Sequence, residues 1–374
     1  MRIFLTHLLA GLFFIQLTFG QAPKQESSLL KLVFAGDIMG HDSQIASAKN
    51  IQNNSYNYDT CFSLLKDYIQ SADIAVANLE VTLAGPPYKG YPQFSSPDPL
   101  AVAAKDAGFD ILITANNHAL DRSKKGIERT ADVLDSLGII HTGTFKNSRE
   151  REVHYPLIVE KNNIRLAILN YTYGTNGLKV KAPNIVNYID KQQIANDLDK
   201  AKTAAPDFII VTIHWGLEYQ RQENQKQKDL AAFFYKHGAD AIIGSHPHVV
   251  QPIRVQYPDV KDSSDYQLTV YSLGNFISNQ RKRYTNGGIM VEMTLEKTKN
   301  TKIVDYSYQP VWVYKPPKKP DGNYFVLVPA NAGNKYLNKL GMPESDRALM
   351  KTFLKDTRSN LGKSSYDSLP TILQ

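Results

Sequence analysis

Short apolar runs alternate with amphipathic stretches along most of this chain, and this alternation limits the folds that it can adopt. Apolar runs of strand length cover residues 32–35, 73–77, 111–114, 208–213 and 240–243. Apolar residues recur at three- and four-residue spacing over 60–71, 98–107, 123–137, 190–204 and 222–237, which predicts helices. A chain that alternates strands with helices is typical of the α/β class.

The pattern changes to consecutive strands after His248. Residues 267–272, 288–295 and 303–313 predict a meander, and residues 155–170 predict a hairpin that turns at Lys161-Asn162-Asn163. We expect these strands to form a second sheet that faces the first, with helices outside. The main domain is predicted over residues 29–315. Residues 320–374, with a helix over 344–361, are predicted to be a C-terminal extension of unassigned role.

The N-terminal twenty residues have the pattern of a signal peptide. Arg2 precedes an apolar stretch over residues 3–19 that is shorter than a membrane span, and a polar segment follows it. We therefore expect cleavage near residue 20 and export to the periplasm, the cell envelope or the medium, with no stable transmembrane anchor afterwards. Cys61 is the single cysteine, so no intramolecular disulfide can form, and we expect it to be a buried core residue.

The charge of the chain is mildly basic, with a formal net charge of +7. Such a balance favours anionic partners weakly. No basic run is interleaved with aromatic residues, so the sequence does not predict nucleic-acid binding.

Residues with metal-ligand side chains directly follow several of the predicted strands. In open α/β sheets the loops at the carboxyl ends of the strands converge, and ligands bind there. Imidazole, carboxylate and amide groups together suit a divalent ion such as zinc, manganese or iron. The predicted metal ligands are Asp37, Glu80, Asn117, His214, His246 and His248.

Two of these histidines flank Pro247. The fixed backbone angle of proline favours an extended chain at this point. In an extended chain the imidazoles of His246 and His248 would point the same way, as two ligands of one metal site require.

Asn116, Asn117 and His118 form a polar turn between a predicted strand and a predicted helix. The functional interpretation makes Asn117 a metal ligand and His118 a proton donor. Asp121 is interpreted as the N-cap of the helix that begins near Ser123.

Six motifs, spread over residues 31–290, together resemble the bacterial CapA family, which is associated with poly-γ-glutamate capsule synthesis and is similar to the calcineurin-like metallophosphatases. The resemblance implies a four-layer αββα sandwich of two facing mixed sheets. The motifs are Gly36-Asp37-Ile38-Met39, Asn78-Leu79-Glu80, Asn116-Asn117-His118, His214-Trp215-Gly216-Leu217-Glu218-Tyr219, Gly244-Ser245-His246-Pro247-His248 with Gln251-Pro252, and Ser272-Leu273-Gly274-Asn275-Phe276.

The resemblance also implies roles for the ligand residues. Asp37 would bridge two metals, Asn117 and His214 would bind one of them, and the two histidines around Pro247 would divide between them. His118 would protonate the leaving group, while the bound ions would activate water and hold the attacked group.

Two positions depart from the metallophosphatase pattern. Met39 stands where the pattern has histidine, and Glu80 stands where it has a bridging aspartate. His41 is displaced by two residues and could compensate, so one ion and two ions are both compatible with the sequence.

Other residues near these motifs are weaker candidates. Trp215, Glu218 and Tyr219 could line a substrate cleft or pack in the core, and Asn275 lies in a glycine turn.

Three functions follow as hypotheses. The first is an exported metal-dependent hydrolase that acts on a polyanionic substrate such as poly-γ-glutamate. The second is an envelope accessory protein that binds an anionic polymer and assists a capsule synthesis or export machinery. The third is a generic metallophosphodiesterase that acts on a phosphoester.

Overall fold

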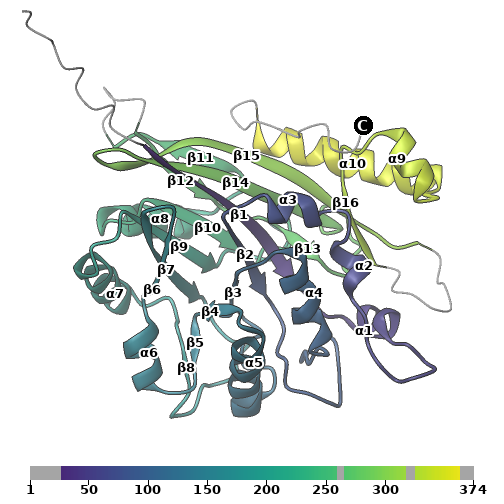
Figure 1. Ribbon diagram of the computed structural model, residues 1–374, viewed down its shortest axis with the longest axis horizontal. Helices are drawn as coiled ribbons and strands as arrows, with labels where there is room; N and C mark the ends of the chain where they lie inside the picture. The colour runs from purple at the N-terminus through teal and green to yellow at the C-terminus, as the bar shows by residue number, and fades with distance from the viewer. Residues whose placement is uncertain (1–26, 259–264, 317–324, 363–374) are drawn as a thin grey trace, which may run out of the picture.

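Two mixed sheets form the centre of the molecule in the computed structural model, which describes residues 27–258, 265–316 and 325–362 (Figure 1). The signal-peptide prediction for residues 1–20 lies outside the described residues. The larger sheet has eight strands in the order β16-β15-β14-β1-β2-β3-β4, with β13 also paired to β1. Its strands are β1 (Ser28–Ile38), β2 (Ile74–Leu79), β3 (Ile111–Ile113), β4 (Ile140–Thr142), β13 (Asn275–Ile277), β14 (Gly287–Lys297), β15 (Thr301–Tyr314) and β16 (Val326–Pro329).

The smaller sheet has six strands in the order β11-β12-β10-β9-β7-β6. Its strands are β6 (Leu157–Lys161), β7 (Ile164–Thr172), β9 (Phe208–His214), β10 (Ala241–Ser245), β11 (Ile253–Gln256) and β12 (Gln267–Val270). The predicted hairpin is present as β6 and β7, and the left-handed backbone of Asn162 and Asn163 forms its turn. A separate ribbon pairs β5 (Thr144–Phe145) with β8 (Ile185–Val186).

Most of the predicted helices are present within a few residues of their expected bounds, but the helix expected over 60–71 is divided into α2 and α3. Among the described residues, no helix combines the length and the apolar character needed to cross a bilayer. The helices are α1 (Asp42–Ala48), α2 (Asp59–Phe62), α3 (Lys66–Gln70), α4 (Pro99–Ala107), α5 (Ser123–Leu137), α6 (Ser148–His154), α7 (Lys191–Thr203), α8 (Gln225–Lys236), α9 (Asn334–Lys339) and α10 (Glu344–Leu361).

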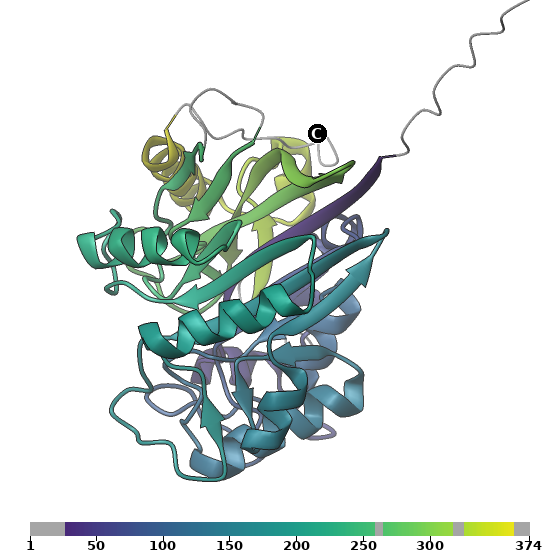
Figure 2. The same cartoon turned by 90° about the vertical axis from the view of Figure 1, so that its left-hand side faces the viewer.

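The alternation of side chains along the strands separates the core into layers. On β1, Leu32 and Phe34 face the core between the two sheets, whereas Val33 and Ala35 face α2, α3 and α4. On β9 the residues alternate in the same way between the intersheet core and a cluster with α7 and α8. Figure 2 shows α7 and α8 in front of the strands of the smaller sheet. This is the predicted four-layer αββα arrangement.

The predicted membership of the two sheets was wrong for several strands. β14 and β15, expected in the second sheet, pair in the same sheet as β1, and β9 and β10 pair with the hairpin instead. Strand pairing joins segments that are hundreds of residues apart, and the apolar pattern of one strand does not identify its neighbour.

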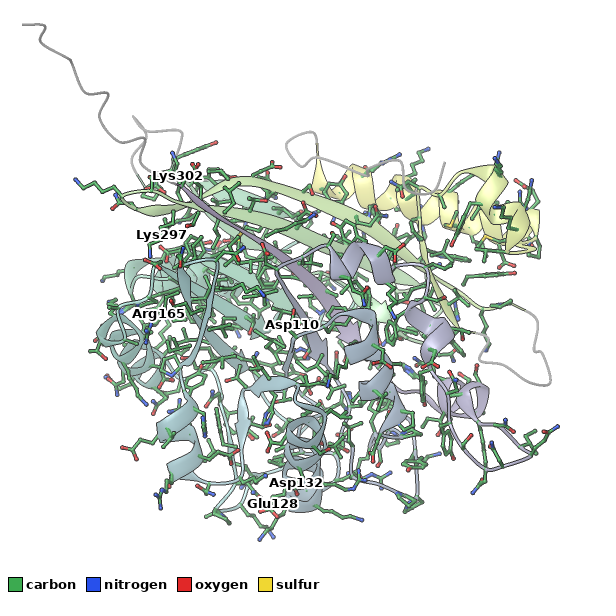
Figure 3. The ribbon with its side chains drawn as sticks, viewed as in Figure 1. Asp110, Glu128, Asp132, Arg165, Lys297 and Lys302 are labelled. Carbon is green, nitrogen blue, oxygen red and sulfur yellow. The ribbon has the colours of Figure 1, made fainter. Side chains whose placement is uncertain are left out.

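Four aspartates anchor the starting ends of parallel strands in the same way. Asp73 accepts a hydrogen bond from the backbone N–H of Lys31 at 2.8 Å, and Asp110 accepts one from Ala75 at 2.8 Å. In the smaller sheet, Asp207 accepts from Arg165 N at 2.8 Å and Asp240 accepts from Ile209 N at 2.7 Å. Figure 3 labels Asp110 and Arg165. These bonds satisfy strand-end N–H groups at the end of each sheet opposite the polar residues described below.

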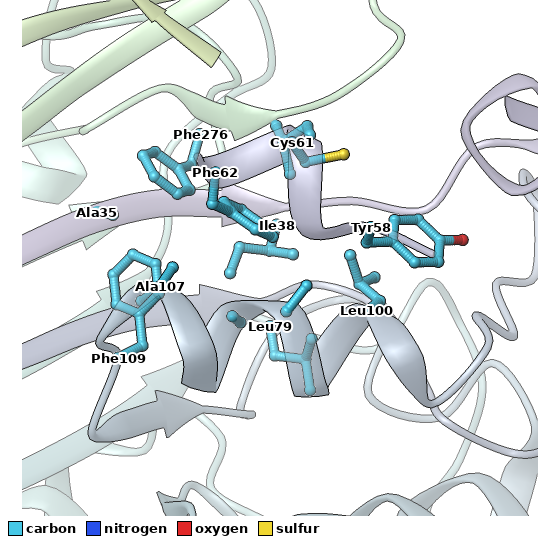
Figure 4. Close-up of a cluster of buried hydrophobic side chains, with 14 of the residues drawn as sticks. Ala35, Ile38, Tyr58, Cys61, Phe62, Leu79, Leu100, Ala107, Phe109 and Phe276 are labelled. Carbon is cyan, nitrogen blue, oxygen red and sulfur yellow. The ribbon is translucent and has the colours of Figure 1, made fainter. Parts of the chain in front are cut away.

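The core between the larger sheet and its outer helices contains Cys61, as predicted. Cys61 is 1% exposed and lies in a cluster that includes Phe62, Leu100 and Phe276 (Figure 4). The Phe62 and Phe276 rings stack with their centroids 5.8 Å apart. Phe276 follows Asn275 directly, so this packing supports the strand β13 that borders the site.

The chain beyond residue 325 packs against the sheets. β16 pairs with the end of β15, and α9 and α10 cover Trp312 and Tyr314. These two residues lie on the same face of β15 as Tyr306, which belongs to the intersheet core. Leu361, at the end of α10, also joins that core. Helix α10 therefore covers a part of the larger sheet that the smaller sheet leaves open.

Candidate metal centre

Asp37 lies at the end of β1 between Asn78 of β2 and Asn275 of β13, its neighbours in the sheet register. Asn78 Nδ2 donates to Asp37 Oδ1 at 2.8 Å. His248 Nδ1 lies 3.2 Å from Asp37 Oδ2 and 3.1 Å from Asn275 Oδ1. Asp37 is completely buried, and these contacts orient its carboxylate.

Glu80 follows β2 and is also completely buried. Its Oε1 atom lies 3.6 Å from His214 Nε2 and 3.8 Å from His248 Nε2, and it accepts no hydrogen bond. Ligand atoms about 2.1 Å from one tetrahedral ion stand about 3.4 Å apart, so these separations suit co-ligands better than hydrogen-bond partners. Burial, and next the charge of Asp37, raise the pKa of Glu80 well above its ordinary value. A cation is needed to hold both carboxylates ionised.

Histidine side chains are the only ion-pair partners of Asp37 and Glu80 within residues 27–258, 265–316 and 325–362. His214 Nε2 lies 2.8 Å from Asn117 Oδ1, and its Nδ1 lies 3.0 Å from Ser245 Oγ. Burial, and next the neighbouring histidines, lower the pKa of His214 well below its ordinary value. The imidazole is therefore neutral, which is the form that binds metal.

The expectation of an extended backbone around Pro247 was wrong. His246 and His248 have φ values of 99° and 57°, in the left-handed region. Tyr219 N donates to Pro247 O at 2.8 Å and ties this turn to the loop after β9. Only the folded chain shows this turn, because it depends on a contact between two loops. Both histidines still reach the site, with ring centroids 6.0 Å apart.

The ligand atoms separate into two groups, each lying within 4.8 Å of one another. Asp37, Glu80 and His214 form the first group, and Glu218, His246 and His248 form the second. Glu218 is exposed, while the other five side chains are buried.

The second group contains another buried atom without a partner. His246 Nδ1 has no hydrogen-bond partner although the residue is only 3% exposed. Burial, and next His248, lower the pKa of His246 to about 3, so its ring is neutral at physiological pH. Glu80 Oε1 and His246 Nδ1 are therefore two buried metal-ligand atoms without a hydrogen-bond partner, one in each group. The residues present therefore fit a divalent metal. Their ligand atoms are compatible with one ion or with two.

Asp121 orients His118 and does not cap helix α5, contrary to the prediction. The cap position is Arg122, which has no side-chain cap, while Asp121 Oδ2 lies 2.7 Å from His118 Nδ1. Asp121 Oδ2 also accepts from Phe94 N at 2.6 Å, and the Phe94 ring contacts His118 edge-on at 4.6 Å. With Nδ1 engaged, Nε2 is the nitrogen that remains for proton transfer. The carboxylate three residues after His118 was the available sequence signal.

Asn116 positions the turn rather than facing the ligand groups. Its Nδ2 donates to Asn78 Oδ1 at 3.1 Å and to Leu79 O at 2.8 Å, and its Oδ1 accepts from His118 N at 3.1 Å. Asn78 itself contacts Asp37, Glu80 and His214. The sequence interpretation missed this central role of Asn78, although its place at a strand end was visible.

His41 lies outside both ligand groups. It precedes α1, and its Nδ1 lies 3.0 Å from Gln44 Oε1 and accepts from Asn279 N at 3.3 Å. Burial lowers the pKa of His41 to about 4. Met39 is buried in the core against the outer helices. In this conformation His41 does not replace the histidine that Met39 displaces.

The aromatic candidates differ in position. Trp215 is a packing residue: it is 2% exposed, and its Nε1 donates to Tyr271 O at 2.9 Å. Tyr219 is 43% exposed, and its ring centroid lies 6.4 Å from that of His248. Tyr173, which sequence reasoning missed, is 46% exposed and lies 4.5 Å from the His246 ring. Tyr173 and Tyr219 therefore border the exposed side of the histidines.

The fold and the site together define an αββα sandwich protein with a metal-ligand cluster at the carboxyl ends of its strands. The model of the family described as bacterial capsule synthesis protein PGA_cap matches residues 31–280, and the chain belongs to this family. The CapA resemblance found in the motifs is thereby confirmed.

Relatives include two proteins of known name. The capsule biosynthesis protein CapA of Bacillus anthracis is 27% identical over 307 residues, which cover 78% of this chain and 70% of that protein. The PGA biosynthesis protein CapA of Bacillus subtilis (strain 168) is 28% identical over 295 residues, covering 74% of this chain and 71% of that protein.

Solved structures with a similar arrangement are more distant. The calcineurin-like phosphoesterase YfkN from Bacillus subtilis has a TM-score of 0.45 and 14% identity, covering 88% of this chain and 100% of that chain. The NAD nucleotidase of Haemophilus influenzae has a TM-score of 0.48 and 11% identity, covering 92% of this chain and 65% of that one.

Proposed function

We propose that this chain is an exported, metal-dependent hydrolase that acts on an anionic polymer of the capsule or cell envelope, of the poly-γ-glutamate class. The observation that carries the proposal is the pair of ligand groups, Asp37–Glu80–His214 and Glu218–His246–His248, within one cluster of strand-end loops. Unpartnered buried donor atoms in both groups support metal binding.

The two groups would hold one or two divalent ions, with manganese, iron and zinc as the chemical candidates. Asn117 Oδ1, beside His214, would add an amide ligand to the first ion. Bound metal supplies a Lewis acid and lowers the pKa of water to the range where it is a nucleophile at neutral pH. The resemblance to metallophosphatases would make Asp37 a bridging ligand. Glu80 Oε1 lies 3.6 Å from His214 Nε2 and 3.8 Å from His248 Nε2, so Glu80 would also supply a carboxylate ligand.

His118 would act as the general acid. Its Nδ1 contacts Asp121, so Asp121 would orient the imidazole while a proton on Nε2 passes to the leaving group. A buried histidine oriented by a carboxylate is an arrangement that general acids use. This pair therefore favours catalysis.

The substrate class comes from the names of the relatives, a capsule biosynthesis protein and a PGA biosynthesis protein. Export is supported by the charged start and apolar stretch of residues 1–20. Hydrolysis of an amide and of a phosphoester need the same Lewis acid and water, so a phosphodiesterase activity is the nearest alternative.

The buried Met39 supports a second candidate function. With methionine in the place of a metallophosphatase histidine, one of the two ions would have fewer ligands. A protein with a weakened centre would bind an anionic polymer through metal and assist the capsule synthesis or export machinery without cleaving it.

Metal analysis and turnover separate these functions. Purified protein should contain metal near stoichiometry, and the His246→Ala/His248→Ala variant should lose it. Equal metal content in the two proteins would refute the metal centre. Wild type should cleave poly-γ-glutamate and His118→Ala should not. Background turnover by metal-loaded wild type would establish the accessory role, and cleavage only of a chromogenic phosphodiester would establish the phosphodiesterase.

A further inference from the structure

A charged cleft with a volume of about 500 Å³ lies between helix α10 and the loop of residues 279–286. Figure 1 shows α10 along the β15–β16 edge of the larger sheet. Basic residues Arg281, Arg283 and Lys315 line the cleft together with the aromatic residues Tyr284 and Trp312. Neither ligand group of the metal centre contributes to its walls.

Two of the cations in this cleft contact the same aromatic ring, that of Phe325. The Arg281 guanidinium lies 5.5 Å from the centroid of the Phe325 ring, and Lys315 Nζ lies 5.1 Å from the same centroid. Desolvation, and next the charge of Arg281, lower the pKa of Lys315. These like charges repel each other, and an anion bound in the cleft would reduce that repulsion.

The acidic residues of the cleft leave Arg281 without a direct ion pair. Asp356 is engaged by Arg283, whose Nε and Nη2 each donate to it at 2.9 Å. Asp346 lines the cleft, but no carboxylate among the described residues lies within ion-pair distance of Arg281. Arg281 donates instead to the backbone carbonyl of Val313 at 2.9 Å. Most of its hydrogen-bonding capacity therefore remains for a ligand.

One short loop joins this cleft to the metal centre. Asn275 Nδ2, beside His248, donates to Gln280 Oε1 at 3.1 Å and to Thr285 O at 2.7 Å. Lys282 Nζ lies 5.0 Å from the centroid of the Tyr219 ring, next to Glu218. The loop thus contacts the metal centre through some residues and lines the cleft through others, so an extended ligand can follow its surface from one site to the other.

We propose that the cleft between α10 and the loop 279–286 is a subsite for anionic side groups of the polymer whose backbone lies at the metal centre. This inference rests on the proposed function, because it assumes that a polymer occupies that centre. Arg281 and Lys315 would bind the carboxylates, and Tyr284 would contact the chain between them. A phosphate group has the same anionic oxygens, so the test includes it separately.

The test compares binding of a fluorescent oligo-γ-glutamate to metal-loaded protein. Arg281→Gln/Lys315→Gln should weaken binding by about tenfold or more, since two charge-assisted contacts are lost. The control Lys236→Gln, on the exposed side of α8, should leave binding unchanged. The variant Arg281→Lys/Lys315→Arg keeps both charges and should retain most of the affinity, which separates lost binding from misfolding.

The outcomes distinguish this inference from the proposed function. The cleft variant should keep the wild-type metal content. Equal oligomer affinity in wild type and in the Gln variant would overturn the subsite. An affinity change for inorganic phosphate, without one for the oligomer, would overturn the polymer assignment. Oligomer binding that depends on Arg281 and Lys315 would support the subsite even if metal-loaded wild type showed only background turnover, a result that would refute the hydrolase proposal alone.

Discussion

His118 Nδ1 lies 2.7 Å from Asp121 Oδ2, and the two side chains are 5% and 1% exposed. In a buried environment this contact holds the imidazole in one orientation. The pair lies on the turn after β3, beside the ligand groups. It connects the metal centre to an acid that can act on a leaving group.

Asp121→Asn should lower kcat by about tenfold to a hundredfold while leaving the metal content unchanged, because it removes only the orienting charge. Steady-state kinetics against pH, with metal analysis of the same samples, provides the measurement. An unchanged kcat in a fully loaded variant would show that Asp121 serves the Phe94 backbone alone.

Glu218→Gln should reduce the metal content by one equivalent if the protein holds two ions. Glu218 is the exposed member of the second group, so the loss of its charge weakens that position and leaves the Asp37–Glu80–His214 group intact. Elemental analysis after dialysis measures this change. Glu152→Gln, an exposed substitution on α6, is the matched control. A full complement of metal in Glu218→Gln would exclude Glu218 as a ligand.

Asp240→Asn should stabilise the protein at alkaline pH. Burial raises the pKa of Asp240 to about 6 in the folded state. The folded pKa lies above the unfolded value, so the protonated group is favourable at low pH, and this contribution is lost as the pH rises through 6. The shift corresponds to at most about 3 kcal/mol.

Urea denaturation of metal-free protein measures this difference. At pH 8, Asp240→Asn should raise the free energy of unfolding by about 1–3 kcal/mol over wild type, with little change near pH 3.5. Asparagine can still accept the hydrogen bond from Ile209 N. Asp229→Asn, on the exposed side of α8, is the control. A gain of the same size at both pH values would contradict the ionisation argument.

Asn360→Ala should weaken both stability and metal affinity. Asn360, near the end of α10, donates to Arg221 O at 3.0 Å and to Val250 O at 2.9 Å, close to Glu218 and His248 in the chain. The loss of both bonds should lower the free energy of unfolding by about 1–3 kcal/mol. Chemical denaturation and a metal titration measure the two effects. Asn338→Ala, on α9, tests whether any C-terminal substitution has the same consequence.

The local parts of this architecture could be read from the sequence. The strand ends at Asp37, His214 and His246 follow apolar runs, and the helix over 123–137 ends at Gly138 in both prediction and structure. These features depend on residues near one another in the chain, so periodicity and turn residues predict them. The helix expected over 60–71 is instead two short helices, α2 and α3.

Other relationships depend on contacts between distant segments. Asp37 is placed between Asn78 and Asn275 by strand register, and Glu218 joins His246 and His248 through a hydrogen bond from Tyr219 to Pro247. Asp121 was assigned to a helix cap because capping is the local role of an aspartate before a helix. In the folded chain Asp121 instead contacts His118, three residues before it, and accepts a hydrogen bond from the backbone of the distant Phe94.

The sequence by itself determined which chemical groups stand at the strand ends, and therefore the αββα class, the family and the metal-type ligand set. Only the tertiary structure decided which strands belong to which sheet and which atoms form each ligand group. It also decided where α10 borders a charged cleft. The physical reason is that residue type and periodicity act over a few residues. Register, close packing and burial, in contrast, arise only when segments far apart in the chain meet.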